Sequence, residues 1–209
     1  MKHYRNTSYI IFSAVLVSII LMLLYSFKLK LENNFEAKYS QLKNECDIIE
    51  GILTNNLINS NSNIGFRFND DIIVEDTACN KVKLIDVING ENVLIYRISE
   101  THCSSCDVAG IESLLKTNLK IPDNRIILIG SFYNTLLLNS YITDNNIKHK
   151  TYNVKQSINI EAEKLNFPYF VVVNKKLEVL SCFFPEKAKP YLTDYYFSGI
   201  KHLFKNGEK

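Results

Sequence analysis

The sequence lacks any cluster of basic residues. Its 24 Lys and Arg residues are nearly balanced by 22 Asp and Glu residues, so the formal net charge over 209 residues is only +2. Nucleic-acid-binding domains usually carry a clustered cationic face. The balanced charge therefore argues against a nucleic-acid partner, and the length suits one ordinary domain with an appendage.

Charged residues are absent from residue 6 to residue 27, and residues 9–27 are apolar apart from three serines. About 20 apolar residues in a helix cross a hydrocarbon core of about 30 Å. A cleaved signal peptide is the alternative, but it would have a shorter apolar core and a small-residue cleavage site. Because this stretch is long and no such site follows it, we expect an uncleaved anchor in the lipid bilayer at residues 9–27.

The charges beside the anchor are nearly symmetric, with Lys2 and Arg5 before it and Lys28 and Lys30 after it. The distribution of positive charge therefore does not determine which way the anchor crosses the membrane. The cysteines favour an oxidising compartment, because disulfide chemistry belongs there. We expect residues 1–8 to form a cytoplasmic tail and the bulk of the chain to lie outside the cytoplasm.

Apolar residues recur at steps of four and three after the anchor. The stripe consists of Phe35, Tyr39, Leu42, Cys46, Ile49 and Leu53. This spacing predicts an amphipathic stalk helix over residues 28–58. The stripe covers fewer than three heptads, so the helix either packs on its own domain or forms the seam of a homodimer. The Asn/Ser-rich stretch from Thr54 to Gly65 predicts a break in the helix, with a linker over residues 59–65.

The remaining residues, 66–209, alternate between strand and helix patterns. Strands are predicted at 71–76, 81–87, 93–98, 125–131 and 147–154, a hairpin at 167–184, and helices at 108–119, 132–146 and 187–205. The helix after residue 106 should bury one face that contains Val108, Ile111, Leu115 and Leu119. Alternation followed by a hairpin indicates an α/β domain with a mixed sheet covered by helices.

Cys103 and Cys106 are spaced C-x-x-C between a predicted strand and a predicted helix. The start of a helix favours a thiolate on the first sulfur, through free N–H groups and the helix dipole. The second thiol, one turn further in, can then resolve a mixed disulfide. A structural zinc site would need two more ligands, usually a second C-x-x-C or H-x-x-x-H, and the sequence has neither. A copper site and a pair without chemistry remain open.

The other cysteines are scattered. Cys182 lies in the predicted hairpin, and we expect it to behave as a small buried apolar residue. Cys79 is either unbridged or paired with Cys182, and the spacing alone does not decide between the two.

From about residue 82 to residue 204 the sequence resembles the TlpA-like, membrane-anchored thiol–disulfide oxidoreductases of bacterial envelopes. The resemblance rests on two stretches, KVKLIDVINGENVLIYRISETHCSSC and FPYFVVVNKKLEVL. It implies a thioredoxin fold, an α/β fold with a mixed central sheet flanked by helices. In that family Cys103 would be the nucleophile and Cys106 the resolving thiol. Pro168 would be a cis-proline facing them, and Phe167 would present its backbone to the substrate.

The resemblance also implies partners and a location. Protein thiols or disulfides would be the substrates, a membrane or envelope redox donor would be the second partner, and no cofactor or metal is implied. The location would be the inner membrane of a bacterium, with the domain facing the periplasm. The alternative function is a non-catalytic, membrane-anchored binding module with the same fold.

Several positions depart from the family pattern. His102 replaces an aromatic residue, Phe167 replaces a small or β-branched residue, Ala109 replaces a glutamate, and Arg97 replaces an acid or amide. A cationic Arg97 or a protonated His102 directed toward the pair would favour the thiolate. The peroxidases related to this family have a threonine where this chain has Glu100, within a proline-led motif, so we do not expect peroxide reduction.

Overall fold

The computed structural model describes residues 2–88, 91–102, 104–116, 119 and 121–204, without the side chains of residues 2–14, 104 and 116. The chain separates into two compact units, Met1–Gly51 and Ile52–Lys209. The first unit is entirely helical in its described part, as the first 50 residues of helix α1, which runs from Lys2 to Asn61. Within the described residues, no helix is long and apolar enough to cross a membrane.

The last turns of α1 belong to the second unit and correct one prediction. The helix continues to Asn61, through most of the stretch predicted as a break, and turns occupy residues 62–65. Tertiary contacts explain the extension, because Ile52 packs against a core cluster and Asn56 exchanges hydrogen bonds with the backbone of Phe184. These contacts outweigh the weak helix propensity of Asn and Ser.

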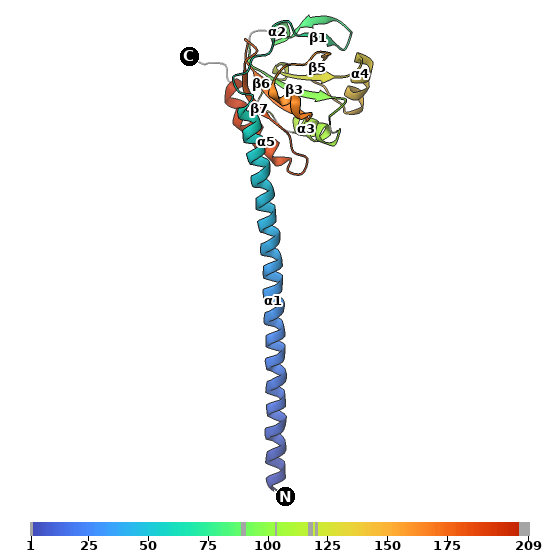
Figure 1. The fold of residues 1–209 in the computed structure, drawn as a ribbon. Coiled ribbons are helices and arrows are strands. Elements are labelled where there is room, and N and C mark those ends of the chain that lie inside the picture. The colour runs from blue at the N-terminus through green and yellow to red at the C-terminus, as the bar shows by residue number, and fades with distance from the viewer. Residues whose placement is uncertain (1, 89–90, 103, 117–118, 120, 205–209) are drawn as a thin grey trace. The chain divides into compact units, whose positions relative to one another are not determined.

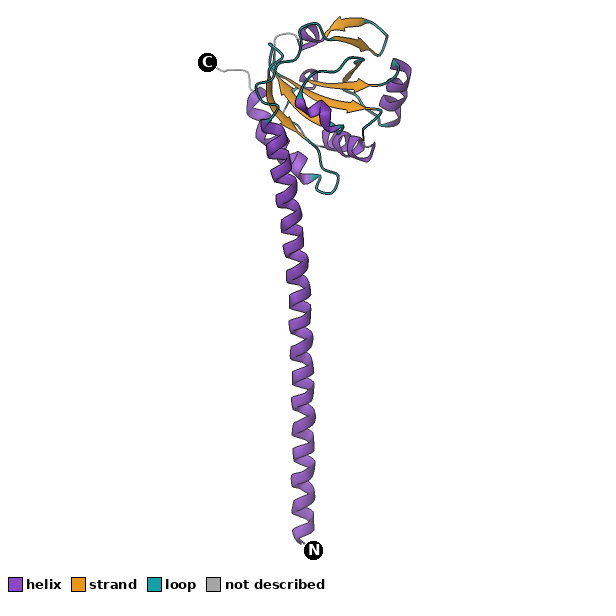
Figure 2. Cartoon of the chain, in the orientation of Figure 1, coloured by secondary structure: helices purple, strands orange, loops and turns teal. Residues whose placement is uncertain are grey.

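The described residues of the second unit form one seven-stranded mixed sheet with helices packed on it (Figures 1 and 2). The strands are β1 (Ile73–Asp76), β2 (Lys81–Lys83), β3 (Val93–Ser99), β4 (Ile126–Ser131), β5 (Lys150–Asn153), β6 (Tyr169–Val173) and β7 (Val179–Phe183). Their order is β2-β1-β5-β4-β3-β6-β7. β3 runs parallel to β4 and antiparallel to β6, so the predicted mixed sheet is confirmed.

Helices and short 3-10 turns connect the strands. They are α2 (Leu84–Ile88), α3 (Ser104–Lys116), α4 (Thr135–Asp144), α5 (Tyr191–Ile200), η1 (Asp123–Arg125), η2 (Glu161–Leu165) and η3 (Lys201–Phe204). Alternate residues of β3 enter two different core clusters, with Ile95 in one and Leu94 and Tyr96 in the other. Because both faces of the sheet are covered, β3 is apolar apart from Arg97 and the terminal Ser99, as fully buried strands usually are.

Two further predictions need correction. Residues 81–87 were predicted as one strand, but β2 ends at Lys83 and helix α2 follows it. Leu84 and Ile88 are both buried and lie four positions apart, which is the spacing of one helix face. The same stretch also alternates apolar and polar residues, and this alternation favoured the prediction of a strand.

Helix α3 forms where it was predicted, but its buried face is rotated. Ile111 is buried as expected, whereas Val108 and Leu115 are 39% and 44% exposed. The other buried positions of α3 are Asp107, Gly110, Ser113 and Leu114. The small Gly110 turns toward the sheet because a large ring lies directly beneath it.

Candidate functional site

The C-x-x-C sequence overlaps the start of α3, which begins at Ser104 after β3 has ended at Ser99. Cys103 lies outside the described residues, and so does any bond between it and Cys106. Cys106 is half-buried in the first turn of α3. The predicted order of a strand followed by a helix is therefore present, and the helix contains Cys106.

Tyr96 of β3 supports the first turn of α3 from below. The side chain is fully buried, and its hydroxyl donates to the backbone carbonyl of Asp107 at 3.0 Å. A Cβ atom at Gly110 would lie 2.1 Å from that hydroxyl oxygen. Only glycine therefore lets α3 lie this close to the ring, which also stacks on Phe170 with centroids 4.3 Å apart. Burial, followed by the charge of Asp107, raises the pKa of Tyr96 well above its usual value.

His102 directly precedes Cys103 in the sequence, and its side chain is only 6% exposed. Its Nδ1 atom lies 3.9 Å from Oδ1 of Asp107, whose side chain is also buried. Burial, followed by the charge of Arg97, lowers the pKa of His102 to about 4, although Glu163 opposes the shift. The imidazole is therefore neutral near pH 7, and the prediction that a protonated His102 favours the thiolate applies only at more acidic pH.

Arg97 is buried in β3 and binds Glu163 of η2 with two hydrogen bonds. Nε lies 2.7 Å from Oε1 of the carboxylate, and Nη2 lies 3.1 Å from Oε2. Nη1 donates to the carbonyl of Ile98 at 2.8 Å, and the hydroxyl of Tyr169 donates to Oε1 of Glu163 at 2.6 Å. An Arg97 directed toward the cysteine pair was expected to favour a thiolate there, whereas the guanidinium is directed toward the carboxylate of Glu163.

The pKa values of this network follow from the pairing. Burial by itself would raise the pKa of Glu163, but the hydrogen bonds and charge of Arg97, with the bond from Tyr169, lower it overall. Burial would likewise lower the pKa of Arg97, and Glu163 raises it overall. Both groups are therefore charged at neutral pH. A buried pair of this kind is costly to break from one side.

A second attachment joins the two loops at the end of the sheet. Thr101 donates from Oγ1 to Oδ1 of Asn166 at 3.1 Å, and Nδ2 of Asn166 donates to the carbonyl of Thr101 at 3.3 Å. Asn166 has a φ of 55°, in the left-handed region that Asn tolerates better than most residues. Together with the Arg97–Glu163 pair, the two hydrogen bonds between Thr101 and Asn166 hold the segment before Pro168 against the segment before Cys103.

The prediction of a cis-proline at Pro168 is wrong, because no peptide bond among the described residues is cis. The trans form of an X–Pro bond is favoured by about 0.5–1 kcal/mol, and the residue before proline prefers extended backbone. Here the left-handed Asn166 makes the turn, and Phe167 and Pro168 lead directly into β6. The side chain of Phe167 is 51% exposed.

Cys106 and Phe167 line the same groove, which has a volume of about 230 Å³. Its remaining lining comes from Leu165, from residues 184–186 and from the last turns of α1. The structure therefore places Cys106 and Phe167, two of the residues that the resemblance assigns to the site, on one groove. No pattern in the sequence indicates that α1 lines this groove, or that Glu163 pairs with Arg97, which lies 66 positions away.

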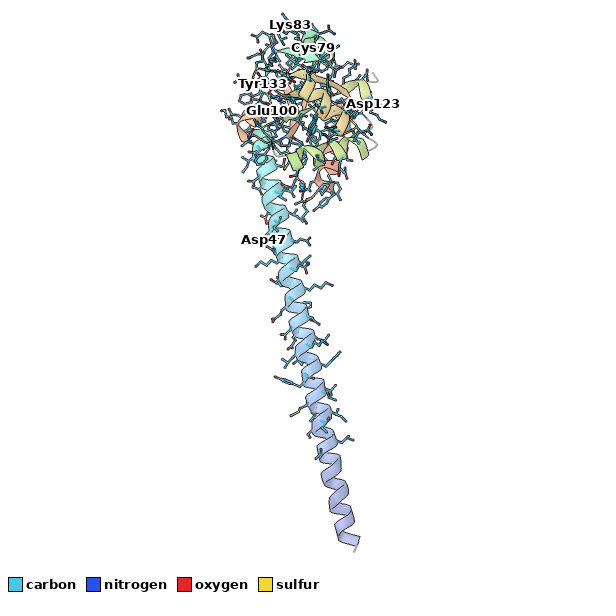
Figure 3. The ribbon with its side chains drawn as sticks, turned by 90° about the vertical axis from the view of Figure 1, so that its right-hand side faces the viewer. Asp47, Cys79, Lys83, Glu100, Asp123 and Tyr133 are labelled. Carbon is cyan, nitrogen blue, oxygen red and sulfur yellow. The ribbon has the colours of Figure 1, made fainter. Side chains whose placement is uncertain are left out.

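Three other residues that were singled out in the sequence are not among the described lining residues of the groove. Glu100 accepts a hydrogen bond from the backbone N–H of Tyr133 at 3.2 Å (Figure 3). Cys182 is buried in β7, where burial raises its pKa to about 12. Cys79 is exposed between β1 and β2 (Figure 3), and neither of these two cysteines forms a disulfide. Within the described residues, no three His, Cys, Asp or Glu side chains gather closely enough to hold a metal ion.

The geometry can be compared with known proteins. No family model matches the sequence, and no curated protein matches it significantly. Among solved structures, a thiol:disulfide interchange protein from Bacteroides sp. is similar at a TM-score of 0.52 and 16% identity, over 70% of this chain and 93% of that chain. The chain has a thioredoxin-like fold.

A second similar structure is the thioredoxin domain of a thiol-disulfide oxidoreductase from Bacteroides vulgatus. Its TM-score is 0.47 and its identity is 15%, over 64% of this chain and 97% of that chain. The names of these two solved structures both refer to thiol–disulfide chemistry. At these identities the likeness concerns the fold, and the chemistry has to be argued from the site.

Proposed function

We propose that the chain is a thiol–disulfide oxidoreductase that exchanges a Cys103–Cys106 dithiol or disulfide with protein substrates. One observation carries the proposal: Cys106 lies in the first turn of a helix that follows the central strand of a thioredoxin-like fold, and it lines a groove. The backbone N–H groups in the first turn of a helix such as α3 can stabilise a thiolate. Phe167 lies across the same groove and is exposed enough to contact a substrate.

The reaction balances without a cofactor. The Cys103 thiolate attacks one sulfur of a client disulfide, and the other client sulfur leaves as a thiolate and takes up a proton. The Cys106 thiol then loses its proton and attacks the Cys103 sulfur, which releases the second client thiol. The client has gained two electrons and two protons, and the cysteine pair has become a disulfide. A membrane or envelope redox donor returns the pair to the dithiol by the same two steps in reverse.

We also propose that the domain is tethered. Residues 9–27 would anchor it in a lipid bilayer, with residues 1–8 in the cytoplasm and the domain outside, in a bacterial inner membrane facing the periplasm. The length and apolarity of residues 9–27 in the sequence support this. The stripe through Cys46 supports pairing of two stalks, and a Cys46→Ser change that removes a cross-linked dimer from a non-reducing gel would test it.

Trapping distinguishes the enzyme from a binding module. With the full chain in detergent, Cys106→Ser should accumulate mixed disulfides with a disulfide-bonded client, because the resolving thiol is gone. Cys103→Ser is the matched control and should trap none. Alkylation of the reduced protein by iodoacetamide at pH 6 to 7 should modify Cys103 first. Equal and slow alkylation of both thiols, with no trapped client, would leave the non-catalytic binding module as the better account.

A further inference from the structure

The last turns of α1 are built into the edge of the sheet. Nδ2 of Asn56 donates to the carbonyl of Phe184 at 3.2 Å, and Oδ1 of the same amide accepts from the N–H of Phe184 at 2.8 Å. The hydroxyl of Ser60 donates to the carbonyl of Cys182. These bonds satisfy backbone groups at the end of β7, the edge strand next to the site. Residues 52–61 are therefore fixed relative to the groove.

This fixed helical segment forms one wall of the groove that Cys106 lines. Asn55 and Asn59 of α1 lie on the wall, and Phe167 and Leu165 lie among the other lining residues. The two asparagines are four positions apart, so they share one face of the helix. Ile52 lines the same groove and adds apolar surface.

The two amides suit a peptide backbone. Within the described part of the chain, the side chains of Asn55 and Asn59 make no hydrogen bond, in contrast to Asn56 between them. Each carboxamide offers two N–H donors and one carbonyl acceptor. An extended peptide presents the same groups, alternately, along its main chain. The apolar lining beside them suits a single apolar side chain of such a peptide.

We propose that this groove binds an extended segment of the client protein beside its reactive cysteine, with Asn55 and Asn59 hydrogen-bonding the client main chain. The inference rests on the proposed function. Cys106 is itself part of the lining, so the groove is continuous with the exchange site and its occupant must approach the reacting sulfurs. Glu186 is the single charged residue of the described lining, which disfavours an acidic client segment and favours a neutral or cationic one.

The test compares two disulfides on the full chain in detergent. One is a synthetic disulfide-linked peptide with leucine beside its cysteine, and the other is hydroxyethyl disulfide, which has no peptide main chain for Asn55 and Asn59 to bind. The double variant Asn55→Ala/Asn59→Ala should lower the ratio of kcat/KM for the peptide to kcat/KM for the small disulfide by about tenfold, since two neutral hydrogen bonds are worth about that factor. The loss should fall mainly on KM.

Asn61→Ala is the matched control, because Asn61 is exposed on the same helix and does not line the groove. Its ratio should stay at the wild-type value, and thermal unfolding should show that all variants are folded. A ratio unchanged in the double variant would overturn the groove proposal alone. So would a wild-type dimer that the double variant dissociates, because a second copy would then be the occupant. A wild type inactive toward both disulfides would overturn the proposed function and, with it, this inference.

Discussion

Replacing Glu163 by Gln should destabilise the domain far more than the same change at Glu161, two residues earlier. Arg97 is 3% exposed and stays charged, because Glu163 raises its pKa against the effect of burial. Glu163→Gln would leave that guanidinium buried without its counter-charge. Glu161 pairs with Lys164 at 2.6 Å on the exposed side of the same 3-10 helix, so it is a matched control.

The magnitude follows from the burial of the pair. Breaking a buried ion pair from one side costs about 3–5 kcal/mol. A glutamine carbonyl still accepts one hydrogen bond from Arg97 or Tyr169, so we expect the lower end, about 3 kcal/mol. For a domain of this size that loss lowers Tm by roughly 6–12 °C. Breaking the exposed Glu161–Lys164 pair should cost only about 0–1 kcal/mol.

The assay is thermal unfolding of the full chain in detergent, followed by circular dichroism and repeated across acid pH. The pKa of Glu163 is lowered in the folded state, so its stabilisation is complete above the unfolded value of about 4.3 and is lost as the pH falls through the folded value. The difference between wild type and Glu163→Gln should therefore shrink below about pH 4.

A double-mutant cycle with Arg97→Met isolates the pair itself. The losses of unfolding free energy in the two single variants should add up to more than the loss in the double variant, by over about 1 kcal/mol. The reason is that residues in one ion pair are energetically coupled. Equal losses in Glu163→Gln and Glu161→Gln, or strictly additive effects in the cycle, would refute the reasoning.

Three further predictions follow from the packing. Gly110→Ala should destabilise the domain by about 1–3 kcal/mol in urea unfolding, because its Cβ would meet the buried ring of Tyr96, and adding Tyr96→Phe should recover only part of the loss. Asn166→Ala should cost about 1–3 kcal/mol, since it removes the bonds to Thr101 and puts alanine in the left-handed region, and Asn166→Gly should recover the backbone part. Cys182 should resist iodoacetamide at pH 7.5 until the chain unfolds, as mass spectrometry would show, and rapid labelling of the native protein would contradict its burial.

The sheet was the most predictable part of the molecule. β3 and β4 are mostly apolar because both of their faces are covered, with Arg97 as the charged exception in β3, and this pattern is visible without any tertiary information. The hairpin of β6 and β7 was visible for a similar reason, with polar residues at its turn. The position of the cysteine pair between β3 and α3 could be predicted because it depends only on the order of neighbouring segments.

The site's supporting contacts could not be predicted, because they join distant residues. Arg97 and Glu163 are 66 positions apart, and no sequence pattern around either residue indicates that they pair. The extension of α1 depends on Asn56 reaching Phe184, 128 positions away, against the local preference of an Asn/Ser-rich sequence. The buried state of His102 likewise follows from how the loops pack, since its own neighbours in the sequence suggest an exposed loop.

These contacts also bear on the direction of the proposed exchange. A strongly oxidising pair stabilises its reduced form through a low thiolate pKa, which nearby cations help to create. Here Glu163 neutralises Arg97, and His102, with a pKa of about 4, is neutral near pH 7. Among the described groups, the amides at the start of α3 favour a thiolate, and the charge of Asp107, which also raises the pKa of Tyr96, disfavours one. This balance favours a reducing pair, with a reduction potential nearer the thioredoxin value of about −270 mV than the DsbA value of about −120 mV. Equilibration of the full chain with glutathione buffers measures that potential, and a result near −120 mV would mean that the described charges do not govern the pair.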